Sequence, residues 1–352
     1  MKILVLGGTG AMGEHLVEIV AASGMETHVT SRTRSGVAGC VHYIQGNAKD
    51  DAFLAPILAR KWDAIVDFMV YSTPAFERRL PRLLESTSQY FYLSSARVYA
   101  NSPGPITEES PRLLDVVKDP EFLATDEYAL AKARQENLLR ASGRRNWTII
   151  RPYITYARER LQLGVLEKEG WLYRALRRRS IVFSRDINER VTTMTSGRDV
   201  ARAMVSLIGK TDALSEAFHV TTSQSHGWNH ILKIYLEAIE THLGFKPRVH
   251  LADLAGFLRC HPSKYQVIYD RVFDRVFDNS KIGRYLDVGS FTPVDNGLRE
   301  ALCAFLSNPT FKQVDWRAEA KKDRLVREHS SLWEPHGLKD KARYAIRRYF
   351  WN

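Results

Sequence analysis

The amino-acid sequence predicts an α/β fold: a Rossmann-type doubly wound parallel sheet with a smaller, interleaved C-terminal domain. In the first half of the chain, short apolar strand patterns alternate with helical patterns, which is the order that parallel sheets show. The chain has 352 residues, of which 44% are hydrophobic and 26% charged. That length supports a large core and more than one domain.

The chain opens with a strand pattern, a glycine-rich turn and a helix pattern. Residues 2–8, KILVLGG, form an apolar run typical of a strand buried on both faces. Residues 7–24 continue with apolar side chains at helical spacing and a closing glycine. Gly8, Gly10 and Gly13 fit G-x-G-x-x-G in the strand–turn–helix context that gives this motif its meaning. The segment therefore predicts a Rossmann-type dinucleotide site, with the phosphates at the helix N-terminus.

The end of the second strand pattern bears on which dinucleotide binds. Residues 27–32, THVTSR, end in Ser31 and Arg32. NAD sites usually place an Asp or Glu there for the ribose hydroxyls, whereas an arginine attracts the 2′-phosphate of NADP. The sequence favours NADP over NAD, and the structural alternative is that these residues only open a solvated loop.

The alternation continues beyond this point. Further strand patterns cover 41–47, 63–70 and 89–95, and helical patterns cover 50–61 and 72–87. Ligands of such sheets bind at the carboxyl ends of the strands.

A tyrosine and a lysine stand one turn apart on the next helical pattern, residues 126–140. They are Tyr128 and Lys132 in the segment YALAK. Ser94 and Ser95 end the preceding strand pattern, on the side of the sheet where ligands bind. A nearby ammonium favours the phenolate form of a tyrosine, so this spacing suits acid–base chemistry.

Five segments together resemble the extended short-chain dehydrogenase/reductase family, many members of which act on nucleotide-linked sugars. They are GGTGAMG at the N-terminus, YLSSARVY after the fifth strand, YALAK, IIRPYITYA at 149–157 and FDNSKIGRYL at 277–286. They span about residues 1–300 in the family's order.

The resemblance implies a role for each matched residue. Tyr128 is the expected general acid/base, Lys132 favours its phenolate and holds the nicotinamide ribose, and Ser95 hydrogen-bonds the reacting oxygen. Ser95, Tyr128 and Arg190 are the expected substrate contacts, with Arg190 on the diphosphate. The residues expected to bind the cofactor are Gly7, Gly10, Ala11, Met12, Gly13, Ser31, Arg32, Asn47, Ala48, Phe68, Met69, Tyr128, Lys132 and Tyr153.

The resemblance also implies a reaction class. The expected activity is NADP-dependent reduction of a 4-keto sugar linked to a nucleoside diphosphate, and the alternative is a nucleotide-sugar epimerase with retained NAD(P). Ala96 and Arg97 replace the Asp-Glu pair of the family's dehydratases, which argues against dehydration. A net charge of +11 keeps open a non-catalytic RNA-binding protein on the same fold.

The expected domains follow the same reasoning. Residues 1–156 form the NAD(P)-binding domain, to which 196–222 return. Residues 157–195 and 223–300 form the substrate-binding lobe, and 301–352 form a basic extension. Family members often pair through the helices expected at 72–87 and 126–140, so a homodimer is expected.

Several other classes of protein are disfavoured. The three cysteines form no C-x-x-C, and His226 and His230 have no third ligand nearby in the sequence, so no metal site is expected. No apolar run reaches about 18 residues, and the short apolar N-terminus does not fit a signal peptide. The cytoplasm is therefore the expected compartment. The basic, aromatic segment 339–352 suits a docked terminal helix, with contact to a membrane surface as the alternative.

Overall fold

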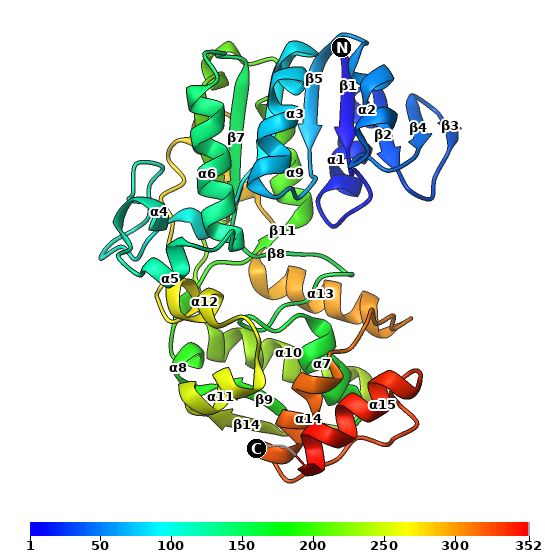
Figure 1. The fold of residues 1–352 in the computed structure, drawn as a ribbon, viewed down its shortest axis with the longest axis vertical. Coiled ribbons are helices and arrows are strands. Elements are labelled where there is room, and N and C mark those ends of the chain that lie inside the picture. The colour runs from blue at the N-terminus through cyan, green and yellow to red at the C-terminus, as the bar shows by residue number, and fades with distance from the viewer. Residues whose placement is uncertain (351–352) are drawn as a thin grey trace. The chain divides into compact units, whose positions relative to one another are not determined.

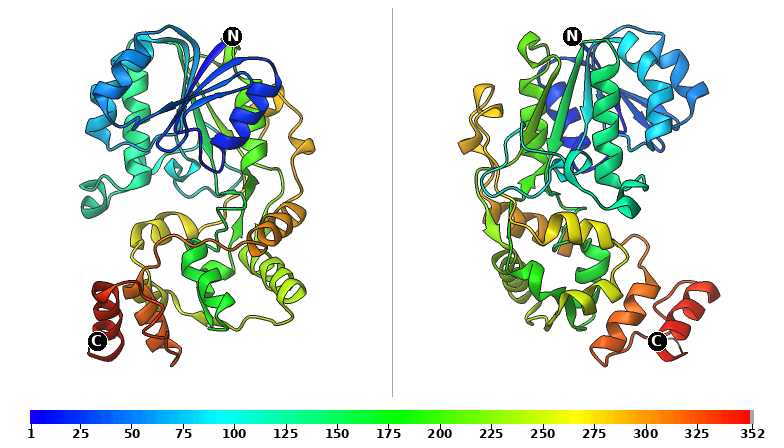
Figure 2. Two further views of the ribbon diagram at one scale, coloured as in Figure 1. Left: turned by 90° about the vertical axis from the view of Figure 1, so that its right-hand side faces the viewer. Right: turned by 60° about the vertical axis from the view of Figure 1, so that its left-hand side comes forward.

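The computed structural model describes residues 1–350 and divides into two compact units (Figures 1 and 2). The first unit comprises Met1–Ala157, Thr193–Gln224 and Val276–Val294. The second comprises Arg158–Thr192, Ser225–Arg275 and the chain from Asp295 onward. The chain passes repeatedly from one unit to the other, so each unit is assembled from segments that are distant in sequence.

An eight-stranded sheet forms the centre of the first unit, in the order β12-β7-β6-β5-β1-β2-β4-β3. Its strands are β1 (Lys2–Leu6), β2 (Glu26–Ser31), β3 (Gly36–Ala38), β4 (Val41–Gln45), β5 (Trp62–Asp67), β6 (Thr87–Leu93), β7 (Trp147–Pro152) and β12 (Glu216–Val220). All neighbouring pairs are parallel except β3 and β4. The predicted α/β fold with a parallel sheet is confirmed.

Helices cover both faces of this sheet (Figure 2). Helices α1 (Gly13–Ala22) and α9 (Gly197–Ser206) pack on one face, against side chains such as Val5 and Phe91. On the other face lie α2 (Asp51–Leu58), α3 (Thr73–Glu85) and α6 (Tyr128–Ala141). The strands read as continuous apolar runs because both faces are covered.

The sequence analysis did not predict β3. This strand has only three residues, all exposed, and it pairs antiparallel at the sheet edge. So short an exposed segment leaves no apolar alternation in the sequence. The first unit also contains the short elements η1 (Ala96–Val98), α4 (Leu113–Val116), α5 (Pro120–Leu123), β8 (Thr155–Tyr156), β11 (Thr195–Ser196), η2 (Thr211–Ala213), η4 (Ile282–Arg284) and η5 (Val288–Ser290).

The second unit is mainly helical. Its longer helices are α7 (Lys168–Leu176), α10 (Trp228–Leu243), α11 (Leu254–Cys260), α13 (Val294–Leu306), α14 (Trp316–Leu325) and α15 (Leu338–Ala345). Its shorter elements are β9 (Ile181–Ser184), α8 (Arg185–Asn188), β10 (Val191–Thr192), β13 (His226–Gly227), β14 (Val249–Ala252), α12 (Lys264–Gln266), η3 (Val267–Arg271) and η6 (Ile346–Phe350). Strands β9 and β14 pair in parallel, and β10 pairs antiparallel with β13.

The C-terminal segment packs within the second unit, where α15 lies beside α14 (Figure 1). Tyr344 of α15 is fully buried, and its hydroxyl donates to Asp323 at 2.7 Å. Asp323 also accepts from the buried guanidinium of Arg174 on α7, at 2.7 Å. Residues 351 and 352 of the predicted tail lie outside the described residues. Within residues 1–350, no helix is both long and apolar enough to cross a bilayer.

Candidate active site

The glycine-rich turn connects β1 to α1 through a backbone that only glycine tolerates well. Gly7 has a φ of 72°, in the left-handed region, and a Cβ there would stand 2.7 Å from the Sδ atom of Met69. A Cβ on Gly13 would stand 2.8 Å from the backbone of Gly8. These two glycines therefore let the turn close tightly and let the helix approach the strand.

Gly10, in contrast, faces open space. Among the described residues, nothing lies within 4 Å of the position that its Cβ would take. Met12, which precedes α1, gives the helix no side-chain cap. The turn thus combines an open approach with helix N–H groups that no side chain caps at Met12, which suits a pyrophosphate. Ala11 and Met12 complete this predicted stretch and are partly buried.

The predicted adenosine end of the site lies after β2 and β4. The buried Oγ of Ser31 accepts from the N–H groups of Thr33 and Arg34, at 3.3 and 3.1 Å, so Ser31 shapes the turn. Arg34 forms an ion pair with Glu14 at 2.7 Å. Arg32 is exposed and takes part in no ion pair within residues 1–350.

The remaining predicted cofactor residues also follow strands of the sheet. Asn47 is exposed and its Oδ1 accepts from the N–H of Lys49, whereas Ala48 is buried. Phe68 and Met69 come directly after β5 and are partly buried. Tyr153, after β7, is buried with its ring 5.3 Å from that of Phe277.

Tyr128 and Lys132 lie on one face of α6, next to the end of β6. Tyr128 is the first residue of the helix. The Nζ atom of Lys132 donates to the carbonyl of Leu93 at 2.6 Å and lies 5.8 Å from the Tyr128 ring centroid. Ser95 follows Leu93 by two residues, and its Oγ accepts from the N–H of Arg97 at 3.2 Å. The fold thus brings Lys132 to both Tyr128 and the strand that leads to Ser95.

Arg97 adds a second cation beside the tyrosine. Its guanidinium carbon lies 5.3 Å from the Tyr128 ring centroid and its side chain forms an ion pair with Glu127 at 2.5 Å. The sequence analysis used Arg97 only as a departure from the dehydratase pattern, and its position two residues after Ser95 was the available signal.

Burial sets the charge state of Lys132. Only 2% of the side chain is exposed, and burial lowers the pKa of the ammonium to about 8, while Asp67 and Glu136 oppose that fall. Burial raises the pKa of Asp67 to about 6. Asp67 accepts from the hydroxyls of Tyr90 and Tyr71 at 2.9 and 3.1 Å. The sequence analysis missed Asp67, although an acidic residue inside the apolar strand pattern 63–70 could have drawn attention to it.

A second buried network anchors α6 to β7. Arg151 donates from Nε and Nη2 to Glu136, at 2.8 and 2.6 Å, and from Nη1 to the Tyr99 hydroxyl at 2.8 Å. Ser94 donates to Glu136 at 2.6 Å. Burial by itself would raise the pKa of Glu136, but Arg151 holds it below the ordinary value. The helix that carries Tyr128 and Lys132 is therefore fixed by a paired buried charge.

One known family model matches the part of the chain that contains all of the predicted site residues. Residues 3–220 match the model of the NAD dependent epimerase/dehydratase family, well over half of the chain. The chain belongs to this family. The predicted resemblance is confirmed, and the matched region contains the glycine-rich turn, Ser95, Tyr128 and Lys132.

Several solved structures share this fold at low sequence identity. The Bordetella bronchiseptica enzyme WbmH in complex with NAD+ has a TM-score of 0.67 at 16% identity, covering 88% of this chain and 99% of that one. UDP-glucuronic acid 4-epimerase from Bacillus cereus, in complex with UDP-glucuronic acid and NAD, has a TM-score of 0.64 at 14% identity, with 87% and 99% covered. At these identities the likeness shows the fold.

One relative in sequence is named as a stem-loop binding protein and not as an epimerase. The chloroplast stem-loop binding protein of 41 kDa b from Arabidopsis thaliana is 25% identical over 238 residues. The match covers 62% of this chain and 58% of that protein, so it spans less than two thirds of the relative.

Arg190 is the one predicted site residue that belongs to the second unit. It is exposed and follows α8, where its N–H donates to the carbonyl of Ile187 at 2.9 Å. Its role on a substrate diphosphate stays a prediction.

Proposed function

We propose that this family member is an NADP-dependent oxidoreductase that reduces a 4-keto sugar linked to a nucleoside diphosphate. The observation that carries the proposal is the buried ammonium of Lys132, held between the carbonyl of Leu93 and the ring of Tyr128. A buried cation beside a phenol is the arrangement that lets tyrosine exchange a proton near neutral pH.

The residues of the glycine-rich turn fit a dinucleotide, because Gly10 is open and the start of α1 has no side-chain cap. A bound reduced nicotinamide supplies the hydride that reduces the sugar carbonyl. Tyr128 transfers its phenolic proton to the carbonyl oxygen, which becomes a hydroxyl, and the resulting phenolate takes a proton from solvent. Lys132 stabilises that phenolate, and Ser95 hydrogen-bonds the same substrate oxygen.

Preference for NADP rests on Arg32. It stands exposed after β2, where NAD sites usually carry an acid, and it is not committed to an ion pair within residues 1–350. Its guanidinium would bind the 2′-phosphate in a bidentate manner.

Two other functions have specific support. An epimerase with retained NAD(P) would use the same three side chains, and similar solved structures carry 4-epimerase names. A non-catalytic RNA-binding protein is supported by the name of the Arabidopsis relative and by the net charge of +11.

The deciding experiment measures NADPH and NADH consumption in parallel with a panel of nucleotide-linked 4-keto sugars. Wild type, Tyr128→Phe and a matched control, Tyr349→Phe, are compared; Tyr349 is exposed near the C-terminus. We expect consumption with NADPH preferred, lost by about 100-fold or more in Tyr128→Phe and unchanged in the control.

Other outcomes would redirect the assignment. Conversion of an ordinary nucleotide sugar to its epimer without net consumption would replace the reductase with the epimerase. Neither activity, no bound nicotinamide and RNA binding that weakens steeply with salt would refute the enzyme and support the RNA-binding alternative.

A further inference from the structure

The second unit brings two histidines and an aspartate to one place. His226 lies in β13 and His230 in the first turn of α10, while Asp295 lies in the first turn of α13. The Nε2 atom of His230 stands 3.0 Å from both carboxylate oxygens of Asp295, and Nε2 of His226 stands 4.0 Å from Oδ1. The sequence analysis expected no metal here because the third group comes from a distant segment.

One atom of this cluster is left without a hydrogen bond. The Nε2 atom of His226 is buried and has no hydrogen-bond partner among residues 1–350. At 4.0 Å from Asp295 it is too far to donate. A neutral imidazole with an available nitrogen is the form that binds metals.

We propose that His226, His230 and Asp295 bind a divalent transition-metal cation, best matched by Zn²⁺. Two imidazoles and one carboxylate form a donor set that suits zinc, whereas Mg²⁺ and Ca²⁺ prefer oxygen ligands alone. The three ligand atoms lie within 4.8 Å of one another. Around tetrahedral zinc, with bonds of about 2.0–2.2 Å, they would stand roughly 3.4 Å apart.

Rotation of the two imidazole side chains is needed to close the site. The two imidazole rings are stacked, with centroids 4.8 Å apart, so side-chain rotation must turn their Nε2 atoms toward a common point. The ligand atoms would have to approach by at most about 1.4 Å, which rotation about the side-chain torsions supplies. Bound zinc would join the beginning of α10 to the beginning of α13 and leave a coordination position for water.

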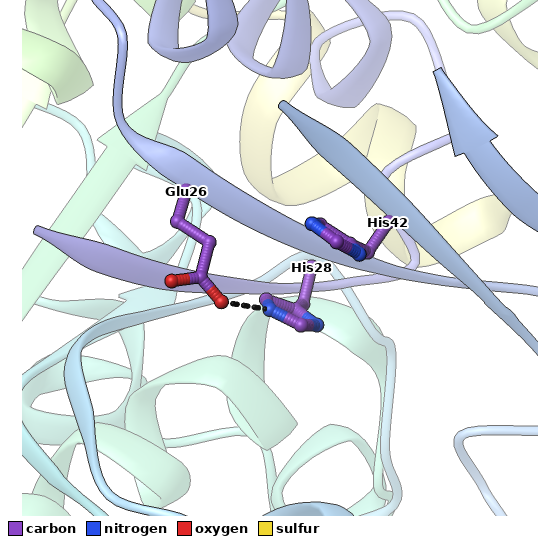
Figure 3. A group of neighbouring side chains, drawn as sticks. All are labelled: Glu26, His28 and His42. Carbon is purple, nitrogen blue, oxygen red and sulfur yellow. Dashed lines mark hydrogen bonds and ion pairs between the residues drawn. The ribbon is translucent and has the colours of Figure 1, made fainter. Parts of the chain in front are cut away.

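A second cluster, Glu26, His28 and His42, offers the same donor types, but two of its groups, Glu26 and His28, are hydrogen-bonded to each other (Figure 3). Nε2 of His28 is hydrogen-bonded to Oε1 of Glu26 at 2.7 Å. The same Oε1 lies 3.6 Å from the ammonium of Lys2, a cation that competes with a metal. The His226 cluster is therefore the better site, and the Glu26 cluster is the natural comparison in an experiment.

Zinc binding to the full chain tests the proposal. Protein stripped with a chelator is titrated with Zn²⁺ by calorimetry, as wild type, His226→Ala, His230→Ala and Asp295→Asn. The matched control is His242→Ala, an exposed histidine at the other end of α10, and His42→Ala reports on the second cluster.

We expect one zinc per chain in wild type and in both His242→Ala and His42→Ala. Each of the three ligand variants should lose at least about tenfold in affinity, since even an outer-shell change costs about 10–100-fold. Zinc should also raise the melting temperature of wild type and not of Asp295→Asn, the variant closest in shape. Absence of zinc binding, equal affinity in the ligand variants, or loss in His42→Ala alone would overturn the proposal.

Discussion

Replacing Asp67 by asparagine tests whether a buried carboxylate keeps Lys132 charged. Asp67 ends β5, accepts hydrogen bonds from Met69, Tyr71 and Tyr90, and raises the pKa of Lys132 against the effect of burial. Because the pKa of Asp67 is about 6, the carboxylate is mostly ionised at neutral pH. Asparagine keeps the shape of the side chain and removes the charge, and it also replaces one accepting oxygen with a donating NH2 group.

The expected size of the effect follows from the pKa values. With a pKa of about 8, Lys132 is about nine-tenths charged at pH 7. A nearby opposite charge is worth about one to three pKa units, so Asp67→Asn should lower the pKa of Lys132, by about two units at the middle of that range. The charged fraction at pH 7 then falls to about one-tenth. If the ammonium is required for proton transfer, activity at pH 7 falls by about ninefold and the alkaline limit moves toward acid by about two units.

Titration by NMR measures the pKa of Lys132 directly and needs no known substrate. The side-chain carbon shift of isotope-labelled lysine is followed with pH, and Lys132→Met identifies the resonance. Asp63→Asn is the matched control, because Asp63 lies on the same strand but is exposed. A midpoint for Lys132 that is the same in wild type and Asp67→Asn would refute the electrostatic role of Asp67.

The difference in free energy of unfolding between wild type and Asp67→Asn should also depend on pH. The pKa of Asp67 rises from an ordinary 3.8 to about 6 on folding, so the folded state favours the protonated acid. This contribution to the free energy of unfolding is present below about pH 4 and is lost as pH rises through about 6. The wild-type free energy of unfolding, relative to Asp67→Asn, should therefore fall by about 3 kcal/mol across that range in urea titrations. A constant difference would contradict the buried, ionisable state of Asp67.

Three further predictions concern the same unit. Gly10→Ala should change the free energy of unfolding by no more than about 0.5 kcal/mol and should weaken NAD(P)H binding, measured by fluorescence. Gly13→Ala should lower the free energy of unfolding by about 1–3 kcal/mol, because its Cβ would meet the backbone of Gly8 at 2.8 Å. Equal free energies of unfolding for the two variants would contradict this difference. Arg151→Met should cost about 3–5 kcal/mol in urea unfolding, because it leaves the buried carboxylate of Glu136 without its main partner; a cost below about 1 kcal/mol would show that the pair is not needed. Arg32→Ala should reduce the preference for NADPH over NADH by about tenfold in steady-state kinetics, and an unchanged ratio would exclude its role on the 2′-phosphate.

Local patterns were enough to predict the parallel sheet and much of the candidate site. The strand, turn and helix at the N-terminus are adjacent in sequence, so the glycine spacing already placed an open turn at the start of α1. Tyr128 and Lys132 are one turn apart, so any helix there puts them on one face. Such features depend on backbone geometry within a few residues, and a single sequence contains that information.

Contacts between distant segments were decided only by the tertiary structure. Lys132 of α6 donates to the carbonyl of Leu93 on β6, and Asp67 lies on the neighbouring strand β5, so the sheet brings these two charges together. Asp295 lies near His226 because the start of α13 is close to the start of α10. Residues 276–294, which the sequence analysis assigned to the substrate-binding lobe, belong to the first unit. The sequence by itself determined which side chains share one turn or one strand end. Which distant charges are buried together was decided by packing, because pairing and desolvation depend on neighbours that the chain brings from far away.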